Sequence, residues 1–401
     1  VTEIDSSSFE DCSNLKSVET PAFAISYIPT SSLKTVAITS GEELPWGAFR
    51  AAAFLTSVSL SDSVTKIGRE AFSGCSSLEA IELPGLLTDI EYCAFENCTS
   101  LVSVTIPNSV TQIDQYAFRG CSNLQSVSLP AIAAVCFTEH ELLSVTITGG
   151  EKIPANAFQN CTSLETLVLK EGIETIGSYA FAGCTSLERI SIPASVTFME
   201  AYVFNDCTGL KEVVFAAETR LEYGRGFEGC MNIESATCFA DMMYYLPQDS
   251  LQTANIIGGS TISNDTFYNA THLREIHISD GIREIGARAF SGCVNLSSLE
   301  IPDSVTSIGE HAFSNCGVKE LILSSAVESV GYACFADSIA LESVIFEEGA
   351  SISVLEKTLY MGCVNLRRLG LPQISDGIEP DALVDCTKLD ELSVPFVGQN
   401  A

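Results

Sequence analysis

A motif of the form Leu-x-x-Val-x-Ile-Pro recurs along the 401-residue chain, and no other feature constrains the fold as strongly. Most successive copies are spaced by 23 residues. A period of this length indicates stacked repeats, each of which buries its apolar side against its neighbours. One continuous stack is therefore expected, although the length alone suggests two or three globular domains. The first position of the motif falls on 18 residues: Leu15, Leu33, Leu55, Leu78, Leu101, Leu124, Leu142, Leu164, Leu187, Leu210, Ile233, Leu251, Leu273, Leu296, Val318, Leu341, Leu366 and Leu389.

A second, longer period is superimposed on the first. From Leu15 the steps are 18, 22, 23, 23 and 23 residues, and the same series begins again at Leu124, which defines a block of 109 residues. The chain is therefore expected to be a single solenoid domain, 1–401, made of duplicated blocks. These are the blocks 15–123, 124–232 and 233–340, followed by a diverged part at 341–401.

Each repeat divides into two parts with different periodicities. The Val and Ile of the motif alternate about an outward residue, which predicts a strand with one buried face, and the Pro ends that strand. The remaining part, Ile-Gly-x-x-Ala-Phe-x-x-Cys-x-x-Leu, has apolar residues three to five positions apart. This spacing predicts a short helical arc, either α or 3₁₀, with Ala, Phe, Cys and Leu on its inner face. Gly68, Gly177, Gly286 and Gly309 are expected to have a positive φ or to allow close backbone approach.

The repeat resembles the BspA-like leucine-rich repeat of bacterial and protozoan surface proteins. The segments SVTKIGREAFSGCSSLEAIELP (63–84) and SVTSIGEHAF (304–313) carry the resemblance most clearly. It covers nearly the whole chain and departs from the pattern in three short repeats, at 15–33, 124–142 and 233–251. It implies an α/β repeat solenoid, a right-handed leucine-rich-repeat superhelix of about 18 turns, with one parallel strand and one short helical or 3₁₀ arc per turn.

The same resemblance implies a function without catalysis. Members of this family are secreted or lie on the bacterial cell surface, and many act as adhesins. We therefore expect an extracellular protein that binds a protein or glycan on host or neighbouring cells. The alternative is a structural spacer or self-associating scaffold that displays another domain of a longer surface protein. The sequence does not assign an oligomeric state.

The composition excludes two classes of partner. The formal net charge is −31, and 18% of the residues are charged. Nucleic acids and anionic membrane surfaces both attract basic patches, so neither is an expected partner. No run of 18 apolar residues occurs, so no membrane-spanning segment is expected.

Sixteen cysteines are present, and most of them occupy one position of the repeat. Repetition places them in a column inside the solenoid, where buried free thiols are favoured over disulfides between neighbouring turns. A metal ladder is disfavoured because no Cys-x-x-Cys motif or adjacent His accompanies the column. Ala52 and Ala270 occupy the same position in two repeats, which is compatible with packing but not with metal binding. The members of the column are Cys12, Cys75, Cys98, Cys121, Cys161, Cys184, Cys207, Cys230, Cys293, Cys316, Cys363 and Cys386.

No pattern of catalytic residues was found. Cys93, Cys136, Cys238 and Cys334 lie outside the column, and none has a His or Asn repeated beside it. The chain contains four His residues and no hydrolase, metalloprotease or phosphate-loop motif. We therefore expect no enzymatic activity, no cofactor and no metal.

The outward side chains of the strands are the expected ligand-binding surface. In the N-terminal part they are mostly Ser and Thr, whereas the later strands carry charged and apolar residues at the same positions. The varied part is the better candidate because isolated apolar side chains can anchor a ligand. The candidate residues are Arg189, Ser191, Glu212, Val214, Glu275, His277, Glu320, Ile322 and Arg368.

An alternative apolar patch lies in the third short repeat. Met242, Met243, Tyr244 and Tyr245 replace the arc there, and they could either form an exposed patch or pack beneath the shortened arc.

Overall fold

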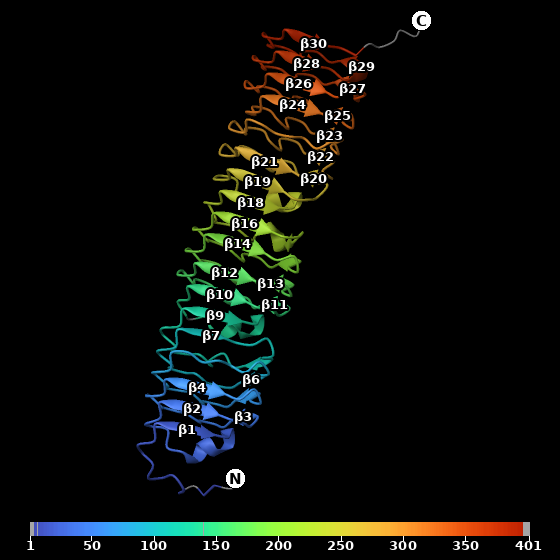
Figure 1. Ribbon diagram of the computed structural model, residues 1–401. Helices are drawn as coiled ribbons and strands as arrows, with labels where there is room; N and C mark the ends of the chain where they lie inside the picture. Colours follow the sequence, from blue (N-terminus) through green and yellow to red (C-terminus); the bar gives the residue numbers. More distant parts are fainter. Residues whose placement is uncertain (1–3, 6, 139, 396–401) are drawn as a thin grey trace. The chain divides into compact units, whose positions relative to one another are not determined.

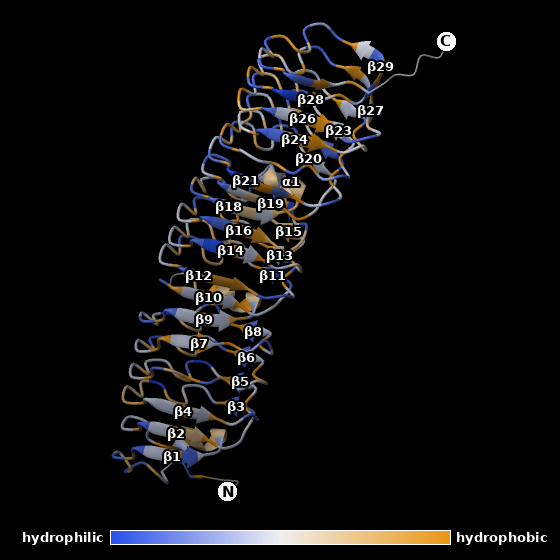
Figure 2. Ribbon diagram, turned by 45° about the horizontal axis from the view of Figure 1, so that its top comes forward, coloured by the Kyte–Doolittle hydropathy of each residue, from blue (hydrophilic) through white to orange (hydrophobic). Residues whose placement is uncertain are grey.

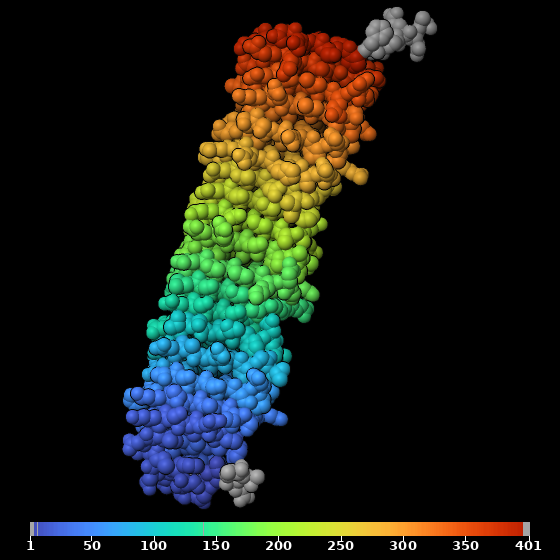
Figure 3. Space-filling model, in the orientation of Figure 1, coloured from blue at the N-terminus to red at the C-terminus, as the bar shows by residue number. Residues whose placement is uncertain are grey.

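The computed structural model describes residues 4–5, 7–138 and 140–395. They fall into two compact units. Unit 1 holds the described residues up to Leu210 and Arg220–Gly229, and unit 2 holds Lys211–Thr219 and the described residues from Cys230 onward. Each unit is by itself a parallel β-solenoid, in which the strands of successive turns lie side by side (Figure 1). The space-filling view shows neighbouring turns of each unit in direct contact (Figure 3).

The strands predicted from the Leu-x-x-Val-x-Ile motif form the first ladder of each unit. About 16 turns carry such a strand, fewer than the expected 18 or so, because the repeats at Leu78 and Leu296 form none. In unit 1 these strands are β1 (Ser17–Thr20), β2 (Thr35–Ile38), β4 (Ser57–Leu60), β7 (Ser103–Thr105), β9 (Ser126–Leu129), β10 (Ser144–Ile147), β12 (Thr166–Leu169) and β14 (Arg189–Ile192). In unit 2 they are β16 (Glu212–Phe215), β18 (Ser235–Cys238), β19 (Thr253–Ile256), β21 (Glu275–Ile278), β24 (Glu320–Leu323), β26 (Ser343–Phe346), β28 (Arg368–Gly370) and β30 (Glu391–Ser393).

A second parallel ladder, which the sequence did not predict, runs through the Thr-x-Ile-Gly part of the repeats. Most of its strands are only two residues long, so their apolar residue looked like a core position and not like a strand. In unit 1 they are β3 (Glu43–Leu44), β5 (Lys66–Ile67), β6 (Asp89–Ile90), β8 (Gln112–Ile113), β11 (Lys152–Ile153), β13 (Thr175–Ile176), β15 (Phe198–Met199) and β17 (Arg220–Leu221). In unit 2 they are β20 (Thr261–Ile262), β22 (Glu284–Ile285), β23 (Ser307–Ile308), β25 (Ser329–Val330), β27 (Ser351–Leu355) and β29 (Gln373–Ile378).

The arc that follows the second ladder is a series of tight bends in most turns, and the expected helical arc is not seen there. In the turn at Gly68, the N–H groups of Glu70, Phe72 and Gly74 donate to carbonyl oxygens of the next turn, at 3.0, 2.7 and 2.7 Å. An α- or 3₁₀-helix would use these N–H groups within the segment. Because alternate N–H groups point along the stack, the arc links neighbouring turns as a strand does.

Helices occur mainly where the repeat is short. The 3₁₀-helices η1 (Ala22–Tyr27) and η2 (Ala131–Cys136) and the one-turn helix α1 (Ala240–Met243) each replace the arc of a short repeat. A further 3₁₀ segment, η3 (Glu222–Gly224), lies in unit 1. Among the described residues, no helix has the length and apolar character that crossing a bilayer requires.

Stacked phenylalanines fill the centre of both units. In unit 1 the rings of Phe49 and Phe72 stack at 5.1 Å between centroids, and in unit 2 those of Phe290 and Phe313 stack at 5.3 Å. Gly68 allows the second ladder to close, because a Cβ there would lie 2.4 Å from the carbonyl oxygen of Leu44. The close approach expected of this glycine is thus present, and its φ is not positive.

Candidate binding site at an open strand edge of unit 2

The first ladder is interrupted after the same strand of each 109-residue block. β4 and β12 in unit 1 and β21 in unit 2 are each the last strand of a sheet, and their equivalent residues are 109 positions apart. After β21 the chain passes through the turn Ser297–Asp303, which forms no strand, before β24 begins a new sheet (Figure 1). The block repeat seen in the sequence is thus also a repeat of the hydrogen-bonding pattern.

The interruption leaves main-chain groups of β21 without a ladder partner. Glu275 N–H donates to the carbonyl of Gln252 in the preceding turn, at 3.2 Å. Alternate residues of a parallel strand bond in opposite directions, so the N–H and C=O groups of Ile276 point toward the turn Ser297–Asp303. Among the described residues, the backbone of Ser298–Ile301 makes no hydrogen bond with β21 or β24. The two ends of this turn bond to the next repeat: Lys319 N–H donates to Ser297 C=O at 3.3 Å, and Ser324 Oγ donates to Asp303 C=O at 3.2 Å.

A depression of about 980 Å³ lies over this open edge. Its inner part includes Leu299 and Ile301, which remain 7% and 9% exposed, whereas Leu323 of the regular strand β24 is fully buried. Ile322 projects outward at its rim and is 63% exposed. The depression therefore offers an apolar base and one prominent apolar side chain.

Four of the residues predicted for ligand binding line this depression: Glu275, His277, Glu320 and Ile322. Its carboxylates outnumber its cationic groups. Besides the two Glu residues just named, Asp280, Glu300 and Asp303 contribute carboxylates, and Lys319 contributes the ammonium group. The electrostatic potential at this edge is therefore negative, as is that of the chain as a whole, which favours cationic ligand groups.

The remaining strand candidates lie elsewhere. Arg368 reaches back across the buried Ser343 and pairs with Glu320, with 3.2 Å between its Nη2 and the carboxylate. Glu212 and Val214 are half-buried on β16, separated from β21 by β18 and β19. Arg189 and Ser191 are exposed on β14 and belong to unit 1. The depression thus contains part of the predicted set, and Arg368 adjoins it through its ion pair.

The packing of α1 corrects the prediction that Met242, Met243, Tyr244 and Tyr245 form an exposed patch. Met242 and Met243 are buried, because the one-turn helix directs both side chains into the core that the Phe turn fills in other repeats. Tyr244 and Tyr245 are 50% and 44% exposed and meet edge to face at 5.3 Å. Only the two tyrosines are accessible to a ligand.

The hydropathy colours follow the expected change along the first ladder. In Figure 2 the ribbons of β4, β7 and β9 are pale, whereas β14, β16 and β24 begin with blue, hydrophilic residues. The pale strands carry Ser and Thr at their outward positions, and the blue ones begin with Arg189, Glu212 and Glu320. The regular Ser/Thr surface of β4, β7 and β9 therefore contrasts with the charged outward residues of β14, β16 and β24.

The cysteine column is buried and has a structural bond of its own. The thiol of Cys75 donates to the carbonyl of Phe49 in the preceding turn at 3.2 Å, and Cys293 bonds in the same way to Phe267 at 3.2 Å. None of the 16 cysteines, all of which lie in the described ranges, forms a disulfide, and all but Cys12 and Cys386 are buried. Burial raises the pKa of the Cys75 thiol to about 12, which disfavours the nucleophilic thiolate.

The residues that replace cysteine in the column can be related to the same hydrogen bond. Ser338 takes the cysteine position and donates to the carbonyl of Phe313 at 2.6 Å. Ala52 and Ala270 follow two short repeats, in which η1 and α1 replace the Phe turn that supplies the acceptor. After the third short repeat, which carries η2, Cys161 donates instead to Leu142 C=O at 3.5 Å. Sequence reasoning found the burial of the column but missed this acceptor, which lies 26 residues earlier in the chain.

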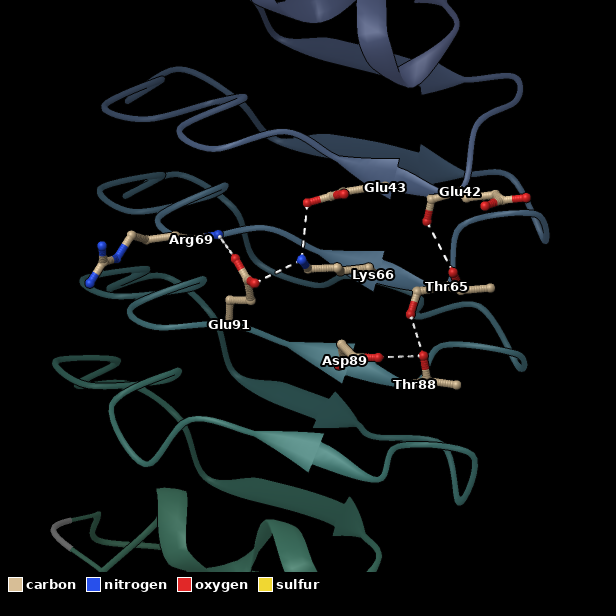
Figure 4. Close-up of polar contacts among 8 residues, drawn as sticks. All are labelled: Glu42, Glu43, Thr65, Lys66, Arg69, Thr88, Asp89 and Glu91. Carbon is tan, nitrogen blue, oxygen red and sulfur yellow. Dashed lines mark hydrogen bonds and ion pairs between the residues drawn. The ribbon is translucent and has the colours of Figure 1, made fainter.

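A charged cluster on the second ladder of unit 1 is fully paired. Lys66 on β5 lies between Glu43 on β3 and Glu91, with N–O distances of 3.2 and 2.8 Å (Figure 4). Glu91 also accepts the backbone N–H of Arg69 at 2.9 Å. Hydrogen bonding to Glu91 and Glu43 raises the pKa of Lys66, and Lys66 in turn lowers that of Glu91. The cluster therefore ties three turns of the second ladder together.

In the described part of the chain, no group of three or more His, Cys, Asp or Glu side chains is arranged as metal ligands.

Comparison with known proteins identifies the repeat. The family model described as "BspA type Leucine rich repeat region (6 copies)" matches residues 1–41, 42–149, 130–256 and 260–395. A comparison with curated proteins found no match.

Several solved structures are similar to this chain. A leucine-rich repeat protein from Bacteroides ovatus is 23% identical over 90% of this chain and 80% of its own, with a TM-score of 0.36. A leucine-rich cell surface protein from Faecalibacterium prausnitzii is 24% identical over 95% of this chain and 83% of its own, with a TM-score of 0.29. The T. pallidum leucine-rich repeat protein is 30% identical over 43% of this chain and 72% of its own, with a TM-score of 0.30.

Proposed function

The chain belongs to the family of BspA-type leucine-rich repeat proteins, and from this premise we propose that it is a non-catalytic, adhesin-like binding protein of a bacterial cell surface. In this proposal the protein works outside the cell and holds a protein or glycan of a host or neighbouring cell in the depression of unit 2.

The observation that carries the proposal is the gathering of Glu275, His277, Glu320 and Ile322 around one open strand edge. Ligand sites combine an apolar base with a few polar groups that set orientation, and this depression has both. The exposed Ile322 beside this concave surface adds apolar area that a partner can bury. The buried thiols, in which burial disfavours the nucleophilic thiolate, support a role without catalysis.

Binding of the purified chain to a panel of matrix proteins, mucins and glycans tests the proposal. We expect saturable binding to at least one member, weakened roughly 10-fold or more by Ile322→Ser, because anchor residues supply much of the affinity. The matched control is Val168→Ser on β12, since Val168 is an exposed apolar residue at the equivalent position of another strand. This control should bind as the unchanged chain does.

The spacer alternative makes a different prediction for the same material. If no member of the panel binds and sedimentation shows concentration-dependent self-association, the chain is a scaffold and the binding proposal is wrong.

A further inference from the structure

The open edge of β21 has the main-chain groups that an added strand needs. The N–H and C=O groups of Ile276 face the turn Ser297–Asp303, whose backbone gives them no partner among the described residues. Ile276 and Ile278 both line the depression, so a ligand lying in it can reach this edge. Next to Ile278, the buried hydroxyl of Ser279 also lacks a partner. Main-chain hydrogen bonds to an exposed sheet edge are a recurring means of holding an extended peptide.

The carboxylates around the edge of β21 favour a peptide with positive charge. Glu275, Glu300 and Glu320 are exposed and occupy outward positions of three successive turns. A strand paired with β21 would lie between these carboxylates, which suit Lys or Arg at the outward positions of the peptide. An acidic peptide would meet these carboxylates and a chain of net charge −31.

The equivalent edge in unit 1 lacks this charge pattern. There β4 is followed by the turn 79–85, in which Glu82 corresponds to Glu300, and a single bridge joins Glu82 to Thr105. The outward neighbours are Ser57 and Ser59 on β4 and Ser103 and Thr105 on β7. Both edges are open, but only the edge in unit 2 combines the opening with several carboxylates and an exposed Ile.

We propose that the depression of unit 2 binds an extended, basic segment of a partner protein, which pairs through its main chain with β21 and places Lys or Arg side chains near Glu300 and Glu320. This inference rests on the proposed function, because it names the class of ligand that the same depression takes.

Three synthetic peptides of about eight residues, long enough to overlap the four-residue strand β21, test the inference by calorimetry on the full chain. The first alternates Lys and Val. The second has the same sequence with alternate main-chain amides N-methylated, and the third replaces Lys with Glu. We expect the first to bind, the second to bind at least about 10-fold more weakly through loss of hydrogen bonds, and the third not to bind.

The variants separate the edge in unit 2 from general acidity. Glu300→Gln combined with Glu320→Gln should weaken binding of the Lys/Val peptide roughly 10-fold, because charged groups around an interface steer and hold a ligand of opposite charge. The matched control Glu82→Gln removes the corresponding charge in unit 1 and should leave binding unchanged.

Two results would overturn the inference. Equal binding of the N-methylated peptide would show that the strand edge is not used, and equal loss in Glu82→Gln would show nonspecific attraction to an acidic chain. Failure of all three peptides, with panel binding that still depends on Ile322, would reject the basic segment and keep the proposed function. Failure of the panel as well would reject both.

Discussion

The two strandless turns, 79–85 in unit 1 and Ser297–Asp303 in unit 2, share a backbone pattern and differ in the side chains around it. Both follow the last strand of a sheet, and both have a Glu at the central outward position, Glu82 and Glu300. Their neighbours are Ser and Thr in unit 1, but Glu275, His277, Glu320 and Ile322 in unit 2. The strandless turn thus occurs in the first and third 109-residue blocks, whereas β14 forms at this place in the second. The chemistry offered to a ligand comes from a few outward positions around the turn.

The buried cysteine column does not differ in this way between the two units. The largest effect that we expect, a loss of stability at alkaline pH, tests whether the two interiors are equivalent. Burial raises the pKa of Cys75 in unit 1 and of Cys363 in unit 2, each to about 12. An unfolded thiol ionises near pH 8.5, so the unfolded state binds fewer protons than the folded state between there and about pH 12. The stability contributed by each neutral thiol is complete below about pH 8.5 and falls by about 1.4 kcal/mol per pH unit above it.

Urea midpoints measured at pH 8, 9 and 10 check this prediction. Cys75→Ser and Cys363→Ser keep a hydroxyl donor, as Ser338 does naturally, and should each make the alkaline loss less steep. If one of the two substitutions changed the slope of stability against pH and the other did not, the interiors of the two units would not be equivalent.

Amide hydrogen exchange tests the open edges directly. The N–H of Ala254 on β19 bonds within its ladder, whereas those of Val58 on β4 and Ile276 on β21 point to strandless turns. Local stability sets exchange rates, so we expect Val58 and Ile276 to exchange on the order of 100-fold faster than Ala254. Protection of Ile276 equal to that of Ala254 would mean that the ladder is closed in unit 2 and would remove the basis for strand pairing.

The periodicity of the sequence predicts which side chains point outward, but it does not predict which backbone groups form hydrogen bonds. Alternation in Leu-x-x-Val-x-Ile placed Glu320 and Ile322 outward and Leu321 inward, as the structure has them. The same alternation occurs in Ser298-Leu299-Glu300-Ile301, which forms no strand, because the pattern records burial and not the distance to the neighbouring turn. The sequence therefore predicted four residues of the depression and not the depression itself.

The second ladder and the arc were missed for a related reason. A two-residue strand such as Lys66–Ile67 is too short to show alternation, so Ile67 looked like one more core residue. The apolar spacing of the arc fits a helix, yet N–H groups such as that of Phe72 bond to the next turn. These hydrogen bonds join residues about 23 positions apart, so no pattern in the local sequence predicts them. They become visible only in the three-dimensional structure.

A smaller effect is expected at the serine that replaces a column cysteine in unit 2. Ser338 donates to Phe313 C=O and accepts the N–H of Cys316 at 3.1 Å, and both bonds are buried. Ser338→Ala should lower the free energy of unfolding by about 1–3 kcal/mol, because a buried N–H loses its acceptor. Thermal unfolding measures the loss. Ala270→Ser is the control, since α1 precedes it in place of a Phe turn, and it should bring no gain.

The smallest expected effect separates the stability of the charged edge in unit 2 from its role in binding. Glu320 and Arg368 form an ion pair at 3.2 Å with both side chains about half exposed or more, and such surface pairs contribute about 0–1 kcal/mol. Glu320→Gln should therefore leave the urea midpoint nearly unchanged while weakening the Lys/Val peptide. If stability fell by several kcal/mol, Glu320 would be a structural residue whose outward position is incidental. If neither stability nor binding changed, the contrast between the edges in units 1 and 2 would not lie in their charges, and Ile322 would remain as the difference that matters.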